Sequence, residues 1–139
     1  MPEQDLLGKR ILVLGGETPL GRALAVGLAE RGADVAIASL TSATEADFAI
    51  NSALNEIWAL GRAGLALTID ASDAAQLRDA VARAERDLGR LDAAATVDPS
   101  RTDLGTLRAA LPARAVIEIR PSASVDEALK VVARQVMSS

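Results

Sequence analysis

Three residue types that often carry chemistry are missing from this sequence: its 139 residues include no cysteine, no histidine and no tyrosine. Without cysteine, the chain can form no disulfide, thiolate metal site or cysteine nucleophile. Without histidine, it lacks the usual general base and the commonest metal ligand, so a Ser-His-Asp triad is excluded within one chain. Without tyrosine, it has no phenolic acid. The chemistry open to the chain is therefore narrow, and we predict no metal site.

Charge and hydrophobicity exclude further classes of protein. The sequence has 15 basic and 19 acidic residues, a net charge of −4 and no basic run, which argues against nucleic-acid binding. No apolar stretch approaches the ~20 residues of a membrane helix. The acidic residues 1–5 lack the features of a signal peptide, which predicts a cytoplasmic protein. A length of 139 residues predicts a single domain over residues 1–139, and a hydrophobic share of 50% indicates a folded globular protein.

Short apolar runs alternate with longer stretches of helical periodicity along the whole chain. Capping residues mark several helix starts: Thr18 with Pro19 after it, Ser72, and Ser124 with Glu127 three residues later. The sequence predicts strands at 10–14, 34–39, 65–70, 91–97 and 115–119, and helices at 19–31, 45–60, 73–88, 102–111 and 124–136.

Five consecutive strand–helix units predict an α/β protein with a parallel sheet. Parallel neighbours need crossover helices, and right-handed crossovers place those helices on both faces of the sheet. We therefore expect a three-layer, doubly wound fold of five strands in the order 3-2-1-4-5. Its binding crevice should lie at the carboxyl ends of strands 1 and 4, where the winding reverses. The segments expected to face this crevice are 15–21, 39–40 and 96–100.

A glycine-containing turn, residues 15–21, joins the first strand to the first helix. Such a turn can present backbone N–H groups and the helix dipole to a phosphate. Two residues oppose that function: Pro19 has no N–H, and Glu17 puts a negative charge where a phosphate would sit. The turn is equally typical of an ordinary helix start, with Thr18 as N-cap and Pro19 at the first helical position.

Segments on both sides of this turn, and others further along the chain, carry a more specific signal. From about residue 6 to residue 97, the chain resembles the short-chain dehydrogenase/reductase family, on the segments 7–13, 21–25, 28–35, 59–61, 69–73 and 88–92. This resemblance implies a Rossmann fold, an NAD or NADP cofactor and a Ser-Tyr-Lys catalytic set. Carried over by position, the cofactor-binding residues would be Gly15, Gly16, Thr18, Leu20, Gly21, Ser39, Leu40, Asp70 and Ala71.

The chain departs from the family pattern at the cofactor site. Pro19 takes the place of the family's middle glycine, and in divergent members that read Gly-Pro-Leu-Gly, Thr18 takes it instead. Ser39 and Leu40 stand where the family has an acidic residue for NAD or a nearby arginine for NADP, so the sequence indicates no preference between the two cofactors. Asp70 matches the family aspartate near the adenine ring, and equally fits an acid that simply follows a strand.

The family's catalytic residues have no counterparts here. Residues 96–99, Thr-Val-Asp-Pro, replace the family's Asn-Asn-Ala-Gly motif. Ser122 and Ser124 lie near the family's catalytic serine but fit better as turn and cap residues. The tyrosine is missing, and Lys130 is expected on the solvated face of the last helix. We therefore predict no catalytic residue.

The sequence thus predicts a truncated, degenerate family member: a non-catalytic dinucleotide-binding or assembly module. We expect it to pair with a second copy of itself or with a full-length relative, through its last two helices or the edge of its fifth strand. The alternative is an NAD(P)-dependent oxidoreductase whose site is completed by a partner chain or by an atypical acid. A third possibility is another anion, such as a nucleotide or acyl phosphate, bound at the helix start after Thr18.

Overall fold

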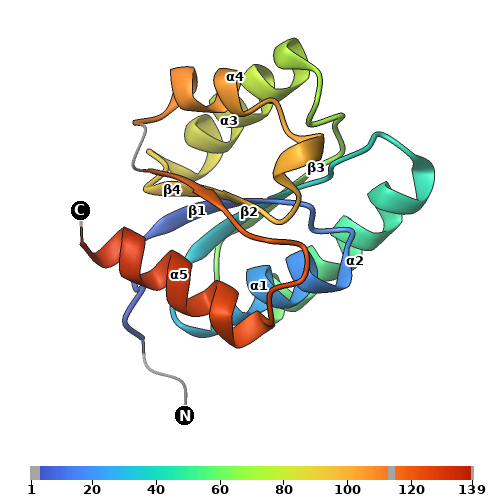
Figure 1. Cartoon of the computed structure of the whole chain (residues 1–139). Helices are drawn as coiled ribbons and strands as arrows, with labels where there is room; N and C mark the ends of the chain where they lie inside the picture. The colour runs from blue at the N-terminus through green and yellow to red at the C-terminus, as the bar shows by residue number, and fades with distance from the viewer. Residues whose placement is uncertain (1–3, 113–114, 139) are drawn as a thin grey trace.

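The structure, a computed structural model, describes residues 4–112 and 115–138. Its strands form one sheet in the order β3-β2-β1-β4-β5, and every neighbouring pair is parallel, as predicted. Helices cover both faces of this sheet, so the three-layer, doubly wound α/β fold is confirmed (Figure 1). The strands are β1 (Arg10–Leu14), β2 (Asp34–Ala38), β3 (Gly64–Leu67), β4 (Ala93–Thr96) and β5 (Val116–Glu118).

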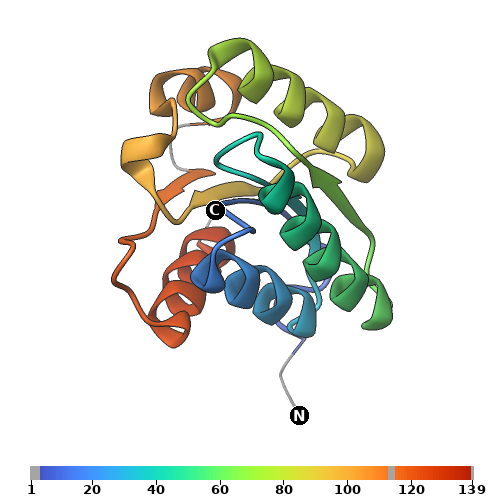
Figure 2. The same ribbon diagram turned by 90° about the vertical axis from the view of Figure 1, so that its right-hand side faces the viewer.

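The helices divide between the two faces according to the direction of winding. The chain moves outward from β1 to β3, then returns past β1 to β4 and β5, and right-handed crossovers place the later connections on the opposite face. Figure 2 shows the resulting layers. One face carries α1 (Pro19–Glu30), α2 (Thr44–Ala59) and α5 (Val125–Met137), and the other α3 (Ala74–Leu88) and α4 (Leu104–Ala110), which a short 3₁₀ turn (η1, Pro99–Arg101) precedes.

The core consists of two apolar layers, one on each side of the sheet. In β1, Ile11 and Val13 point toward α1, α2 and α5, whereas Leu12 and Leu14 point toward α3 and α4. All four side chains are fully buried. A central parallel strand is covered on both faces, which explains why this segment is a continuous apolar run instead of an alternating one.

The predicted helix caps are confirmed at two of three positions. Thr18 and Ser124 are N-caps, and the side chain of each accepts a hydrogen bond from a backbone N–H in the first helical turn. The prediction for Ser72 was wrong, because Asp73 caps α3 instead. Helix α3 begins at Ala74, so Asp73 occupies the cap position, and its side chain accepts from the Gln76 N–H at 3.1 Å. The Ser72 hydroxyl instead donates to a carboxylate oxygen of Asp70 at 2.6 Å.

Strand β3 ends at Leu67, three residues earlier than predicted. The cause lies in β2, where the sequence places Ser39 at the strand end. The Ser39 hydroxyl donates to the Ile69 carbonyl at 2.8 Å and accepts from the Ile69 N–H, also at 2.8 Å. One side chain thus satisfies both backbone groups of Ile69, and the backbone ladder between β2 and β3 stops before it.

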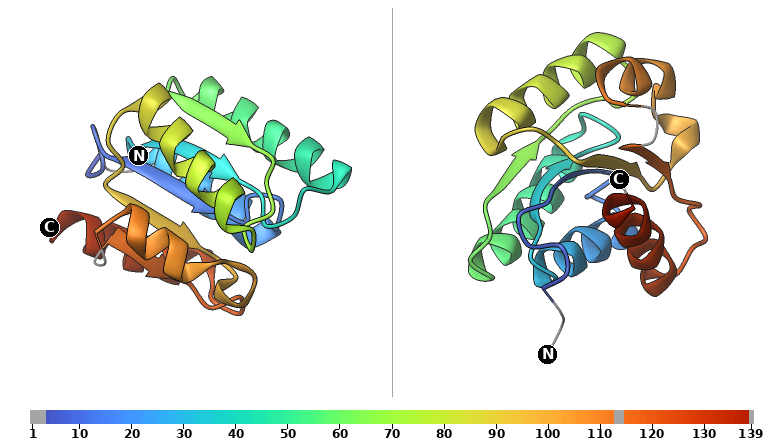
Figure 3. Two further views of the ribbon diagram at one scale, coloured as in Figure 1. Left: turned by 90° about the horizontal axis from the view of Figure 1, so that it is seen from above. Right: turned by 90° about the vertical axis from the view of Figure 1, so that its left-hand side faces the viewer.

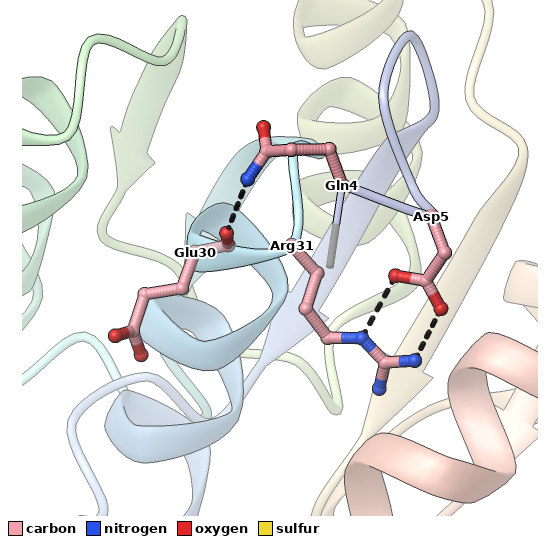
Figure 4. A network of polar contacts seen from close by, with 4 residues as sticks. All are labelled: Gln4, Asp5, Glu30 and Arg31. Atoms are coloured by element: carbon pink, nitrogen blue, oxygen red, sulfur yellow. Dashed lines mark hydrogen bonds and ion pairs between the residues drawn. The ribbon is translucent and has the colours of Figure 1, made fainter. Parts of the chain in front are cut away.

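The segment before β1 is fastened to the end of α1 (Figure 4). The Arg31 guanidinium donates to both carboxylate oxygens of Asp5, with 2.9 Å between Nε and Oδ1. Hydrogen bonding from Arg31 holds the pKa of Asp5 below its usual range, so the carboxylate stays charged. The Gln4 amide donates to the Glu30 carbonyl at 2.8 Å, and Leu6 is fully buried in the core. These contacts set the entry of the chain into β1.

The last two helices lie on opposite faces of the sheet. Figure 3 shows α4 beside α3 on one face and α5 beside α1 on the other, in agreement with the packing of their buried side chains. Strand β5 lies between the two helices, at the edge of the sheet. A surface made jointly by α4 and α5, as the sequence led us to expect, would therefore have to wrap around the β5 edge.

Candidate functional site

The predicted site residues come together at the carboxyl ends of the strands. The N–H of Gly15 donates to the Ala38 carbonyl at 2.8 Å, which joins the glycine turn to the end of β2. The N–H of Ala71 donates to the Leu40 carbonyl at 3.0 Å, and the Ala71 carbonyl accepts from Asp103 at 2.9 Å. The loops that follow β1, β2, β3 and β4 are thus connected by backbone hydrogen bonds along one edge.

Two glycines of the turn allow the main chain to pack closely, Gly21 against the carbonyl of Gly15 and Gly16 against the side chain of Ile37. A Cβ on Gly21 would lie 1.9 Å from the carbonyl oxygen of Gly15, and one on Gly16 would lie 1.9 Å from Cγ2 of Ile37. Such distances are impossible without displacing the main chain or the core. These glycines are therefore required to place α1 directly against the end of β1, whether or not a ligand binds there.

Two N–H groups of the turn remain available to a ligand. The Thr18 hydroxyl donates to the Gly15 carbonyl at 2.7 Å and accepts from the Gly21 N–H at 3.0 Å, so its cap function occupies it. Among the described residues, nothing accepts a hydrogen bond from the N–H groups of Glu17 and Leu20. Both lie at the start of a 12-residue helix, where the dipole attracts an anion.

The Glu17 carboxylate does not lie over this helix start, contrary to our expectation from the sequence. It turns to the end of β2, where its oxygens accept from the Leu40 N–H at 2.8 and 3.2 Å and from the Thr41 N–H at 3.3 Å. The carboxylate thus fastens the first strand–helix turn to the second. It also leaves the N–H groups of the α1 N-terminus uncovered.

A cavity of about 650 Å³ opens beside this contact. Its volume falls in the range of small-molecule sites. Predicted residues Leu40 and Asp70 belong to its lining, which consists of Leu40, Thr41, Ser42, Ala43, Asp70, Ser72, Ser100 and Arg101. Hydrogen bonds from Ser72 hold the pKa of Asp70 below its usual range, and the charge of Arg101 acts in the same direction. The cavity therefore combines hydroxyl groups, an ionised carboxylate and a guanidinium.

Ser39 and Ala71 have structural positions behind this cavity. Both residues are fully buried. The Ser39 hydroxyl faces Ile69 and makes both of its hydrogen bonds there. The structure places these two predicted residues where they support the wall, with their side chains directed away from the crevice.

A second cavity, of about 280 Å³, lies at the start of α1. Its lining comes from the start of α1, the segment after β4 and the loop after β5: Thr18, Pro19, Leu20, Val97, Asp98 and Pro121. Asp98 is the ionisable residue of this lining, and its Oδ1 accepts from the Ser100 hydroxyl at 2.6 Å. The second cavity thus borders the helix start, whereas the first lies beside the Leu40 and Thr41 N–H groups that Glu17 binds.

Sequence reasoning missed the residues that shape the segment after β4. The hydroxyls of Thr96 and Thr102 lie 2.8 Å apart in the interior, and Thr102 also donates to the Asp98 carbonyl at 3.0 Å. This closed network turns the chain back toward β3 and brings Ser100 and Arg101 to the first cavity. The signal that could have indicated it is the pair of threonines six residues apart, on either side of Pro99.

Within residues 4–112 and 115–138, no group of three or more acidic side chains could hold a metal ion. No helix in the same ranges is long and apolar enough to cross a membrane.

Comparison with known proteins relates this geometry to a family. Residues 9–97 match the family described as short chain dehydrogenase. The chain is 40% identical over 87 residues to an L-rhamnose 1-dehydrogenase (NAD(P)(+)) of Sphingomonas sp. (strain SKA58), covering 63% of this chain and 33% of that protein. It is 36% identical over 96 residues to a cyclohexanol dehydrogenase of Rhodococcus sp. (strain TK6), covering 64% and 36%. The chain thus spans about a third of the length of these curated relatives.

Solved structures agree with this assignment. A putative short-chain alcohol dehydrogenase from Sinorhizobium meliloti 1021 superposes with a TM-score of 0.64 and 28% identity, over 78% of this chain and 50% of that one. Carveol dehydrogenase from Mycobacterium avium, solved in complex with NAD, superposes with a TM-score of 0.61 and 26% identity, over 66% and 35%. From the sheet order, the glycine turn and the match over residues 9–97, we conclude that this chain belongs to the short-chain dehydrogenase family.

Proposed function

We propose that this chain binds a nicotinamide adenine dinucleotide as a Rossmann module and does not by itself catalyse hydride transfer. The observation that carries the proposal is the helix start of α1, where the N–H groups of Glu17 and Leu20 are open and one of the two cavities borders the first residues of the helix. The relatives named above are dehydrogenases, and one neighbour was solved with NAD. These residues lie at the carboxyl ends of the strands, which is where the Rossmann fold binds dinucleotides.

The residues present fit such a cofactor. The pyrophosphate would lie at the open N–H groups, where two donors and the dipole of α1 favour an anion. The adenosine would occupy the 650 Å³ cavity, beside Leu40 and Asp70. The nicotinamide would lie toward the second cavity, beside Leu20 and Asp98. When bound, the nicotinamide would supply hydride chemistry, whereas the chain's own residues bind and orient the cofactor.

The lack of a suitable acid supports a binding function without catalysis. Reduction of a carbonyl needs a proton donor placed beside the developing alkoxide. These 139 residues contain no tyrosine and no histidine. Asp98 is the one ionisable side chain that the second cavity offers, and it stands alone there. If the chain oxidised an alcohol or reduced a carbonyl in an assay, that result would favour the alternative, an oxidoreductase that uses this acid or completes its site from a partner chain.

Isothermal titration of the full chain with NAD⁺ and NADP⁺ tests this proposal. We expect measurable binding of at least one dinucleotide, and no reduction or oxidation across a panel of alcohols and carbonyls. Ala43→Trp should weaken binding by about tenfold or more, because Ala43 is exposed on the cavity wall and an indole would fill the space. Calorimetry is preferred to fluorescence, since Trp58 lies in the last turn of α2, away from the cavity at the helix start.

Two control variants separate the site from the fold. Ala109→Trp places the same indole on an exposed position of α4 and should leave the dissociation constant unchanged. Ser39→Ala should cost about 1–3 kcal/mol of unfolding free energy, because it leaves the Ile69 N–H unpaired, yet it should change the affinity less than about twofold. The proposed function is refuted if titration gives no heat of binding with either NAD⁺ or NADP⁺ at millimolar concentration.

We also propose that the chain pairs through the free edge of β5. Within the part of the chain that the structure describes, β5 pairs with β4 alone. The Ile119 N–H donates to β4, so by alternation the N–H of Glu118 points away from the sheet. Glu118→Pro should abolish dimers seen by sedimentation velocity, whereas Glu118→Ala, which loses only the ion pair with Arg108, should retain them. A wild-type monomer at high concentration contradicts this mode of pairing.

A further inference from the structure

The end of β2 has no acidic residue of its own, yet it carries a carboxylate. The residues that follow the strand are Ser39, which is buried, and Leu40. Glu17 reaches this position from the turn after β1, and its oxygens accept from the N–H groups of Leu40 and Thr41 at distances between 2.8 and 3.3 Å. An acid far from β2 in sequence thus occupies the place of a strand-end acid.

We propose that Glu17 sets the cofactor preference of this chain, so that it binds NAD⁺ in preference to NADP⁺. The inference rests on the proposed function and concerns the adenosine end of the same site. In the dinucleotide-binding fold, the adenosine ribose lies near the end of β2, where an acid accepts from its free hydroxyls. Glu17 supplies that acceptor, and its charge disfavours a phosphate on the ribose 2′-oxygen.

The hydrogen bonds of Glu17 leave room for one more donor. An ionised carboxylate has about four acceptor positions. Three of them are used here, two by the Leu40 N–H and one by the Thr41 N–H. The remaining position can accept a ribose hydroxyl. A phosphate is chiefly an acceptor, and the two N–H groups at this point of the wall already bond to Glu17.

The charges around the cavity also favour NAD⁺ over NADP⁺. Its lining within the described ranges contains a single cation, Arg101, and this guanidinium acts on the Asp70 carboxylate across the cavity. With Glu17 beside them, the three groups carry a net negative charge. Repulsion from this wall should disfavour the two extra negative charges of a 2′-phosphate, because like charges placed together across an interface are unfavourable.

Titration of the wild-type chain and two variants with NAD⁺ and NADP⁺ tests the inference. We expect the wild type to bind NAD⁺ about tenfold more tightly than NADP⁺. Glu17→Gln keeps the size of the side chain and removes its charge, so it should narrow this ratio by about tenfold, chiefly through tighter binding of NADP⁺. Glu30→Gln is the matched control. It makes the same change on an exposed residue at the far end of α1, whose carboxylate points away from Gln4 and Asp5 (Figure 4), and should leave the ratio unchanged.

A measurement on the wild type keeps the test independent of the variant's folding. Because the discrimination is electrostatic, raising the ionic strength from about 0.02 to 0.5 M should reduce the NAD⁺ to NADP⁺ preference. Equal affinity for both dinucleotides in the wild type, or an unchanged ratio in Glu17→Gln, would overturn the inference while the proposed function stands. Binding of neither dinucleotide would overturn both.

Discussion

Gly21→Ala is expected to destabilise the fold by about 3 kcal/mol or more, because the new methyl group meets main chain and not a movable side chain. A Cβ at this position would lie 1.9 Å from the Gly15 carbonyl oxygen and 2.5 Å from its carbon. Relief requires α1 to move away from the end of β1, which breaks the Thr18 cap and the packing of the helix on the sheet. Urea denaturation followed by circular dichroism measures the loss.

Gly105→Ala is the matched control for this prediction. Gly105 lies in the first turn of α4, and a Cβ there would meet only Oδ1 of Asp103, at an ordinary contact distance of 3.6 Å. Alanine has the higher helix propensity, so the variant should be as stable as the wild type or more stable by up to about 1 kcal/mol. If Gly21→Ala unfolds at the same urea concentration as the wild type, the close approach of α1 to β1 described here is incorrect.

Leu24→Ala should lower the free energy of unfolding by about 2–5 kcal/mol. Leu24 is fully buried in the layer between α1 and the sheet, together with Ile11, Val13 and Leu28. Truncation removes apolar contacts from the middle of this layer and leaves a cavity that the rigid central strand cannot fill. The change appears as a lower denaturation midpoint with an unchanged slope against denaturant concentration.

Phe48→Ala removes a larger side chain and should cost less than about 0.5 kcal/mol. Phe48 is 81% exposed on α2, although it is the single phenylalanine of the chain. The pair of variants therefore separates burial from residue size. A loss for Phe48→Ala comparable to that for Leu24→Ala would mean that this face of α2 is covered in solution.

The sheet and its strand order could be predicted because each follows from regular patterns. A continuous apolar run such as residues 11–14 indicates a strand covered on both faces, and helices between successive strands require parallel pairing. The right-handed crossover then allows few strand orders. The helix ends were predicted where the cap acts within its own helix, as at Thr18, since that interaction depends only on neighbouring residues.

The sequence-based predictions were wrong where a side chain could bond either to a local partner or to a distant one. Ser72 and Asp73 are both good N-caps by type; Asp73 caps α3, and the Ser72 hydroxyl donates to Asp70. Ser39 ended β3 early by bonding to Ile69, which is 30 residues away in sequence. No local pattern contains that information, because the partner is set by the register of β2 against β3.

The candidate site was predictable in position and not in its interactions. The loops after β1, β2 and β3 had to meet at one edge once the sheet was parallel, and the glycine turn marked the helix start. The direction of the Glu17 side chain was not predictable, since it depends on how far the Leu40 and Thr41 N–H groups stand from the turn in space. The same holds for Arg101, whose segment is held by contacts such as the one between Thr96 and Thr102.

The pairing of β1 with β4 has a consequence for the growing chain on the ribosome. Arg10 donates its N–H to Asp92 Oδ2 across 82 residues of sequence, and β1 pairs with β4 from Ile11 and Ala93 onward. Until Ala93–Thr96 has been synthesised, a nascent chain that has already made β2 and β3 must keep the second edge of its central strand open. The crevice therefore cannot be complete until β4 and the segment that follows it, with Ser100 and Arg101, have been synthesised.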